Sequence, residues 1–151
     1  MNNTQSPARR RPVDSLLWRY TESHRHPVNE LIHCICVPAI VFTLLGMIWS
    51  LHPLAAYAVV LTALIYYFFL SSRLALGMLL MAACFLSVLG ALPVTLIRPV
   101  CAGVFVLAWI GQFIGHHIEG KKPSFFDDLR FLLIGPLFVL GVLYRRLRIP
   151  Y

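Results

Sequence analysis

The stretch that decides the fold is residues 29–70, NELIHCICVPAIVFTLLGMIWSLHPLAAYAVVLTALIYYFFL. It contains two long apolar runs, 29–51 and 54–70, which are separated only by His52 and Pro53. A helix that crosses a bilayer needs about 20 predominantly apolar residues. The stretch therefore predicts two membrane-spanning helices, and they must run antiparallel because so short a link turns the chain straight back.

Two further apolar runs of the same kind follow, at residues 74–97 and 100–118. The connections are again short, with residues 71–73 before the first of these runs and Arg98-Pro99 between the two. We therefore expect an all-α integral membrane protein, an antiparallel up-and-down bundle of four transmembrane helices.

The two ends of the chain predict other structures. Residues 1–12 form a basic tail rich in Asn, Ser, Pro and Arg, for which we expect disorder. Residues 13–23 carry apolar side chains at helical spacing and predict a short interfacial helix, the start of a single domain that continues to residue 151. The apolar segment 125–146 predicts a re-entrant segment or a fifth crossing. The basic residues that follow it favour the re-entrant form, because a fifth crossing would place them outside.

Composition agrees with a membrane protein. The chain is 59% hydrophobic and 13% charged, with a mean hydropathy of +0.76, whereas soluble domains are about a quarter charged. The net charge of +7 comes from Lys and Arg that flank apolar runs, which indicates headgroup anchoring rather than nucleic-acid binding. The expected location is a bacterial inner membrane or, in a eukaryote, the endoplasmic reticulum.

Five of the six histidines fall into two clusters at the mouths of apolar runs. The first cluster is His24, His26 and His33, and the second is His116 and His117. An even number of crossings returns the chain to its starting side, so both clusters are expected at one surface, which we take as cytoplasmic. Because imidazole is the commonest metal ligand, this convergence is the main functional signal in the sequence.

Helical spacing groups polar side chains with two of these histidines. Gln112, His116 and Glu119 share one face of the last span, and Asn29 and His33 share one face of the first. Polar groups at this depth in a membrane are usually functional or paired with one another.

A turn at Pro27 can fold His24 back over His33, so that three histidines and a carboxylate enclose one cation. Such a ligand set suits Fe(II), Zn or Mn, and open positions favour an iron that activates oxygen. Three side chains are candidates for orienting the ligand rings: Tyr20, Asn29 and Gln112.

Each of these features also has a structural alternative. An interfacial histidine often contacts lipid headgroups, and Glu119 can form an ordinary loop salt bridge with Lys121 or Lys122. The same two lysines, together with Arg25, can bind a lipid phosphate or attract the carboxylate of an amphiphile to the site.

The order and spacing of the polar residues resemble a known family. The first motif is Tyr20-x3-His24-x4-Asn29-x3-His33-x4-Pro38. The second is Trp109-x2-Gln112-Phe113-Ile114-Gly115-His116, followed by Glu119-Gly120-Lys121-Lys122-Pro123. Over about residues 13–140 the chain resembles the 2-hydroxy fatty acid dioxygenase family, fungal alpha-oxidation enzymes whose bacterial homologues were long catalogued as a domain of unknown function.

The resemblance implies an Fe(II)-dependent dioxygenase that uses O2 to cleave long-chain 2-hydroxy fatty acids between C1 and C2, giving fatty acids one carbon shorter. It implies that His24, His33 and His116 bind the iron, with Glu119 as the fourth catalytic ligand. Fungal members have one more residue before this glutamate, so His117 is a second candidate for the fourth ligand. The candidates for binding the substrate are Tyr20, Arg25, Lys121 and Lys122.

Two other functions compete with this one. The chain can be a membrane protein that binds metal without catalysis, such as a sensor or an assembly factor, or a scaffold whose polar cluster only packs the bundle. A lipid hydrolase is disfavoured because no serine lies in a G-x-S-x-G motif. The sequence leaves open the acyl chain length and whether the chain forms a homo-oligomer.

Overall fold

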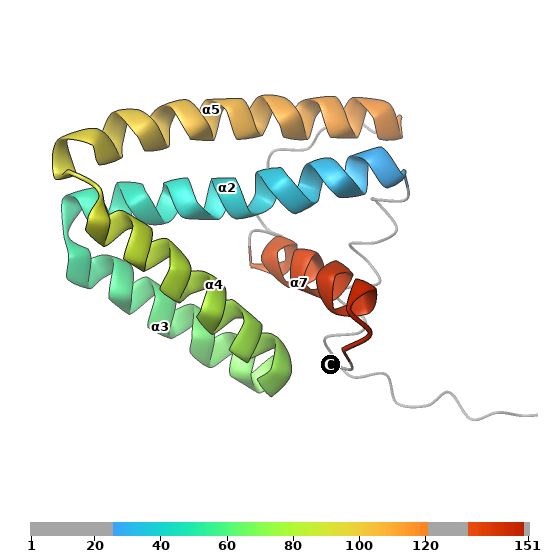
Figure 1. Ribbon diagram of the computed structural model, residues 1–151, viewed down its shortest axis with the longest axis horizontal. Coiled ribbons are helices and arrows are strands. Elements are labelled where there is room, and N and C mark those ends of the chain that lie inside the picture. The colour runs from blue at the N-terminus through green and yellow to red at the C-terminus, as the bar shows by residue number, and fades with distance from the viewer. Residues whose placement is uncertain (1–25, 121–132, 150–151) are drawn as a thin grey trace, which may run out of the picture.

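The computed structural model describes residues 26–120 and 133–149, and within these ranges the chain forms helices and no strand. Figure 1 shows the five described helices: α2 (Pro27–Leu51), α3 (Pro53–Leu70), α4 (Ser72–Ala91), α5 (Val94–Glu119) and α7 (Ile134–Arg146). The predicted fold class, all-α with four long apolar helices in antiparallel order, is confirmed. The predicted basic tail and interfacial helix lie outside the described residues.

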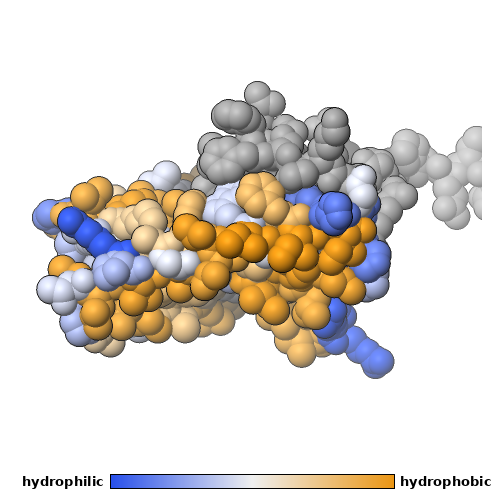
Figure 2. Space-filling model, turned by 90° about the horizontal axis from the view of Figure 1, so that it is seen from above, coloured by the Kyte–Doolittle hydropathy of each residue, from blue (hydrophilic) through white to orange (hydrophobic). Residues whose placement is uncertain are grey.

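The four long helices have the dimensions and surface of membrane spans. Helices α2 to α5 are each long and apolar enough to cross a bilayer. The shortest, α3, has 18 residues, which span about 27 Å of a hydrocarbon core about 30 Å thick. Large apolar side chains point outward, as at Leu51 and Phe69, which are 78% and 82% exposed. Figure 2 shows hydrophilic residues at the two ends of the molecule and an apolar band between them, a surface suited to lipid.

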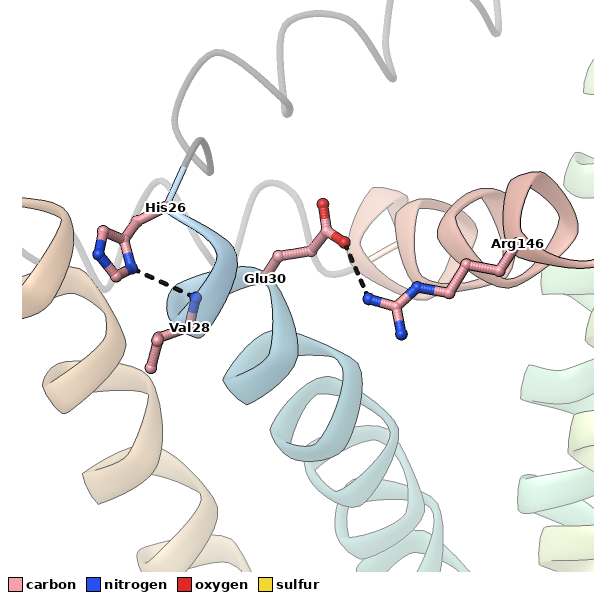
Figure 3. Close-up of polar contacts among 4 residues, drawn as sticks. All are labelled: His26, Val28, Glu30 and Arg146. Carbon is pink, nitrogen blue, oxygen red and sulfur yellow. Dashed lines mark hydrogen bonds and ion pairs between the residues drawn. The ribbon is translucent and has the colours of Figure 1, made fainter.

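A His-Pro pair begins each of the first two long helices. His26 and His52 are the N-caps, and Nδ1 of each accepts a hydrogen bond at 3.2 Å from the backbone N–H two residues later; Figure 3 shows the bond at His26. The proline occupies the first helical position, where a missing N–H costs nothing. The repeated His-Pro pair therefore marks two helix starts in the sequence, although the prediction from apolar run lengths did not use it.

The third connection lies in a different place from the predicted one. We expected a turn at Arg98-Pro99, but α4 ends at Ala91 and the chain turns at Leu92 and Pro93. The second connection is also shorter than expected, since only Ser71 separates α3 from α4. Hydropathy alone did not show whether the chain turns at Pro93 or at Pro99, because apolar residues lie on both sides of each proline.

Arg98 and Pro99 lie inside α5 for a physical reason. A membrane helix tolerates a proline where neighbouring groups satisfy the backbone. The Arg98 guanidinium reaches the carboxyl end of α2, where Nε donates to Ser50 Oγ and Nη2 donates to Ser50 O, both at 3.2 Å. Arg98 therefore caps a neighbouring helix instead of marking a turn.

The C-terminal helix α7 has 13 residues and a length of about 20 Å, too short to cross a bilayer. Its carboxyl end lies beside the amino end of α2, where Arg146 Nη2 is 3.6 Å from Glu30 Oε1 (Figure 3). The described part of the C-terminal segment therefore ends on the side of the molecule where α2 begins, as the re-entrant prediction requires.

Helix α2 is the centre of the packing. It lies beside α5 along most of its length, and the hairpin of α3 and α4 diverges from this pair (Figure 1). One apolar cluster joins α3, α4 and α7, and includes Tyr67, Leu74, Leu137 and Phe138. A second joins the four long helices near the opposite end, and consists of Leu45, Ala56, Leu89, Ile97 and Cys101. The α2–α5 seam remains, and the polar residues lie there.

Candidate metal centre

Two of the predicted ligand histidines meet between α2 and α5. The ring centroids of His33 and His116 are 5.1 Å apart, with the ring planes at 89°, and the residues are 1% and 6% exposed. A metal–nitrogen bond is about 2.1 Å long, so the centre of a bound imidazole lies about 3 Å from its ion. The 5.1 Å separation of the ring centroids is therefore within the range for two imidazoles that share one ion.

Glycines on α5 allow this approach. A Cβ atom at Gly115 would collide with Asn29 Oδ1, and one at Gly111 would lie 2.6 Å from Cys36 Sγ. Two small residues four apart let helices in lipid bring their backbones close together. Because Gly115 precedes His116 in the sequence, this contact sets how near the α5 imidazole comes to α2. In the sequence, the Gly111-x3-Gly115 pattern indicates this close contact between α5 and α2. The prediction did not use it, because it considered only the spacing of polar residues.

The backbone of α2 orients the His33 ring. Nδ1 of His33 is 3.0 Å from the carbonyl oxygen of Asn29, one turn earlier. A carbonyl only accepts hydrogen bonds, so Nδ1 carries the proton and the lone pair of the neutral ring lies on Nε2. Histidines that bind metals typically donate their other ring N–H to a carbonyl or carboxylate in this way.

Glu119 joins the end of α5 to the start of α2. Its Oε2 accepts hydrogen bonds from the His26 N–H at 2.8 Å and from Asn29 Nδ2 at 3.1 Å. A carboxylate is favourable at this position because the amino end of a helix presents unpaired N–H groups and a partial positive charge. Gly120, with φ of 71°, ends α5 immediately after this contact.

The other predicted site residues have different placements. Gln112 is buried, 4% exposed, one turn before His116, as expected from their shared face. The two candidates for the fourth ligand differ in position. His117 is exposed, whereas Glu119 accepts a hydrogen bond from the start of α2. The remaining candidates lie outside the described residues: Tyr20, His24, Arg25, Lys121 and Lys122.

The described residues bring two candidate metal ligands together but do not form a complete ligand set. Within residues 26–120 and 133–149, no group of three His, Cys, Asp or Glu side chains lies close enough together to hold an ion. The two facing imidazoles, one with its Nδ1 bonded to a carbonyl, nevertheless have the chemistry and the spacing of a ligand pair for a divalent transition metal. A metal bound here would need at least one further ligand besides these two imidazoles.

An apolar cavity of about 340 Å³ lies between α2, α3, α4 and the first turn of α7. Tyr67 contributes its ring to the lining, because its hydroxyl donates to the Leu133 carbonyl at 2.8 Å. Three methionines, whose flexible side chains adapt to irregular shapes, also line it: Met47, Met78 and Met81. The cavity is thus a space for hydrocarbon, not for a polar ligand.

Comparison with known proteins identifies the family. The family described as 2-hydroxy-palmitic acid dioxygenase Mpo1-like matches residues 11–147. The chain belongs to this family. Among Mpo1-like proteins, the 2-hydroxy-palmitic acid dioxygenase MPO1 of Saccharomyces cerevisiae is 31% identical over an alignment of 134 residues that covers 83% of this chain and 76% of the yeast protein. No solved structure matches the chain significantly.

The resemblance inferred from the two motifs is therefore confirmed. The Mpo1-like match extends from before α2 to the end of α7 and includes His33, His116 and Glu119. The contacts between α2 and α5 thus lie in the part of the chain that the family shares.

Proposed function

We propose that this chain is an Fe(II)-dependent membrane dioxygenase that cleaves long-chain 2-hydroxy fatty acids with O2, giving fatty acids one carbon shorter. The observation that carries the proposal is the pair of buried imidazoles, 5.1 Å apart, in a chain whose yeast relative is named a 2-hydroxy-palmitic acid dioxygenase. Histidines with a carboxylate are the ligands that oxygen-activating ferrous iron prefers, and that iron would supply the redox chemistry.

In this scheme the residues around the ion hold it and keep water away. His33 and His116 are two ligands and His24 is a third, while Glu119 or His117 occupies the fourth position. The carbonyl of Asn29 fixes the His33 ring, which lowers the cost of ordering it when the ion binds. Burial of both described imidazoles excludes competing solvent.

The basic residues after α5 are suited to bind the substrate carboxylate. Lys121 and Lys122 follow Gly120, which closes the helix directly behind Glu119. Tyr20 and Arg25 are the further candidates for the substrate's polar end. Charge-assisted bonds from such groups would hold the carboxylate beside the ion.

The distribution of charge favours a site that faces the cytoplasm. Among the described residues, the end of the molecule with the two histidines carries Arg73, Arg145, Arg146 and Arg148, and the opposite end carries Arg98. Cytoplasmic surfaces hold the excess of Lys and Arg. We accordingly place the protein in a bacterial inner membrane, or in the endoplasmic reticulum if the source is eukaryotic.

The apolar cavity is suited to the methyl end of the acyl tail. On α2 the lining of the cavity begins at Val41. This residue lies eight positions after His33, which is about 12 Å farther along the helix. One leaflet is about 15 Å deep, so an acyl tail whose polar end lies beside His33 reaches the level of the cavity.

Two neighbouring alanines on α4 provide the test of the tail position. Ala82→Leu fills the cavity, whereas Ala83→Leu adds the same atoms to an exposed position. We expect Ala82→Leu to shift the ratio of activities on long and short 2-hydroxy acids about tenfold toward short ones, because overpacking excludes the tail end. Identical chain-length profiles in the two variants would contradict this placement.

The proposed activity is tested on anaerobically purified protein in detergent. We expect stoichiometric iron, O2 uptake with 2-hydroxypalmitic acid, and a product one carbon shorter. His116→Ala should lose iron and turnover together, while His52→Ala, which removes a helix cap at the far end, should keep both. Turnover without metal would reject the scheme, and iron without O2 uptake would favour a non-catalytic metal-binding protein.

A further inference from the structure

We infer that Glu119 is a positioning residue, a carboxylate clasp that acts on the metal centre through Asn29 instead of binding the ion. The inference rests on the proposed function, because it assigns a role to a residue beside the proposed metal site. The sequence left open whether this carboxylate binds the ion or forms a loop salt bridge, and the contacts among described residues point to a third role.

The first step is the bonding of Glu119 Oε2. This oxygen accepts from two donors, the His26 N–H at 2.8 Å and Asn29 Nδ2 at 3.1 Å, and both belong to the start of α2. The His26 N–H belongs to the helix cap, and the Asn29 side chain is completely buried. Oε2 is therefore engaged by two fixed donors, and the carboxylate is held against the helix end, where its charge is most favourable.

The second step is the position of Asn29 between the two imidazoles. Its backbone carbonyl bonds to His33 Nδ1, and its side chain packs against Gly115, the residue before His116. One residue thus contacts the group that orients one imidazole and the helix turn that carries the other. When Glu119 holds Asn29, it indirectly holds the spacing of both rings.

A second carboxylate at the same helix start lacks these contacts. Glu30 pairs with Arg146 on α7 at 3.6 Å, and its side chain is 28% exposed. Its removal also deletes an interhelical charge pair, but within the described part of the chain its carboxylate bonds neither to Asn29 nor to either imidazole. Glu30→Ala is therefore the matched control for the loss of a carboxylate.

The test measures Co²⁺ affinity of the metal-free protein in detergent, with Co²⁺ as an air-stable substitute for Fe(II). Glu119→Gln keeps an amide oxygen that accepts both hydrogen bonds but is a poor metal ligand, so its affinity should stay within about threefold of wild type. Glu119→Ala and Asn29→Ala should each bind Co²⁺ about 10–100-fold more weakly, as is usual when an orienting group is lost. Glu30→Ala should bind as wild type does.

The opposite pattern would overturn the inference. If Glu119→Gln binds as weakly as Glu119→Ala while Asn29→Ala binds normally, the carboxylate itself is a ligand. Thermal unfolding of the metal-free protein gives a second test that needs no metal. The double variant of Glu119→Ala and Asn29→Ala should lose less stability than the sum of the two single losses, because both single variants remove the shared Asn29–Glu119 hydrogen bond.

Failure of the two proposals can be distinguished. A wild-type protein that binds no Co²⁺ would reject the proposed metal centre, and the unfolding measurements would still decide on the clasp. Additive losses of stability in the double variant would show that Glu119 and Asn29 act independently, which contradicts the clasp whatever the metal result.

Discussion

Replacing Gly115 by Ala should push α2 away from α5 and disrupt the candidate metal centre. A methyl group at this position would overlap Asn29 Oδ1 and lie 3.3 Å from Ile32 Cγ2. The Asn29 side chain is completely buried and bonded to Glu119, so it cannot move aside without breaking that hydrogen bond. We therefore expect the two helices to separate, and the two imidazoles with them.

Two opposing effects determine how Gly115→Ala changes the free energy of unfolding. Alanine is about 1 kcal/mol more favourable than glycine inside a helix. Overpacking of a close contact costs about 1–3 kcal/mol. Gly103→Ala is the matched control, because it lies on the same helix and its added Cβ would meet no atom within 4 Å. The difference between the two variants isolates the contact at Gly115 and should be about 1–3 kcal/mol.

The assay is unfolding of the metal-free protein in one detergent, followed by tryptophan fluorescence, together with Co²⁺ affinity. Gly115→Ala should be less stable than Gly103→Ala and should bind Co²⁺ at least about tenfold more weakly, because small misplacements of ligands weaken a site strongly. Equal stability of the two variants, combined with wild-type Co²⁺ affinity in Gly115→Ala, would refute the claim that this glycine sets the spacing of the rings.

Three further substitutions test the packing around the site. Tyr67→Phe removes the hydrogen bond to the Leu133 carbonyl and should lower the free energy of unfolding by about 1 kcal/mol, and an unchanged value would show that this bond does not hold α7. Arg98→Ala removes both bonds to Ser50 and should cost about 1 kcal/mol in the same assay, with Arg98→Lys, which retains the charge, losing less. Arg146→Ala breaks a partly exposed ion pair, so its effect should stay below about 1 kcal/mol and shrink further as salt is added; a loss that salt does not reduce would point to packing instead of charge.

The apolar pattern was enough to predict four helices in antiparallel order. The length of an apolar run can be compared directly with the thickness of a bilayer, and links of two or three residues force consecutive helices to run antiparallel. The third turn was placed wrongly because Arg98 and Pro99 interrupt the apolar pattern more clearly than Pro93 does, and the packing of Arg98 against the end of α2 shows that Pro99 continues the helix.

Helical spacing predicted some of the polar side chains that meet between α2 and α5, but not the hydrogen bonds that join them. Helical spacing placed Asn29 with His33 and Gln112 with His116, and the two motifs identified the family. Spacing did not reveal that Glu119 bonds to the first turn of α2, because a single helix carries no information about which neighbour its carboxylate will meet.

The sequence of each segment was enough to predict four helices long and apolar enough to cross a bilayer, with histidines near the start of the first and the end of the last, since periodicity and apolar length act within each segment. The three-dimensional packing alone establishes that His33 and His116 lie edge to face and that Asn29 lies between the groups that hold them. The reason is that two glycines on α5 have no side chain to keep the helices apart. How close this brings α2 can be seen only when both helices are placed in three dimensions.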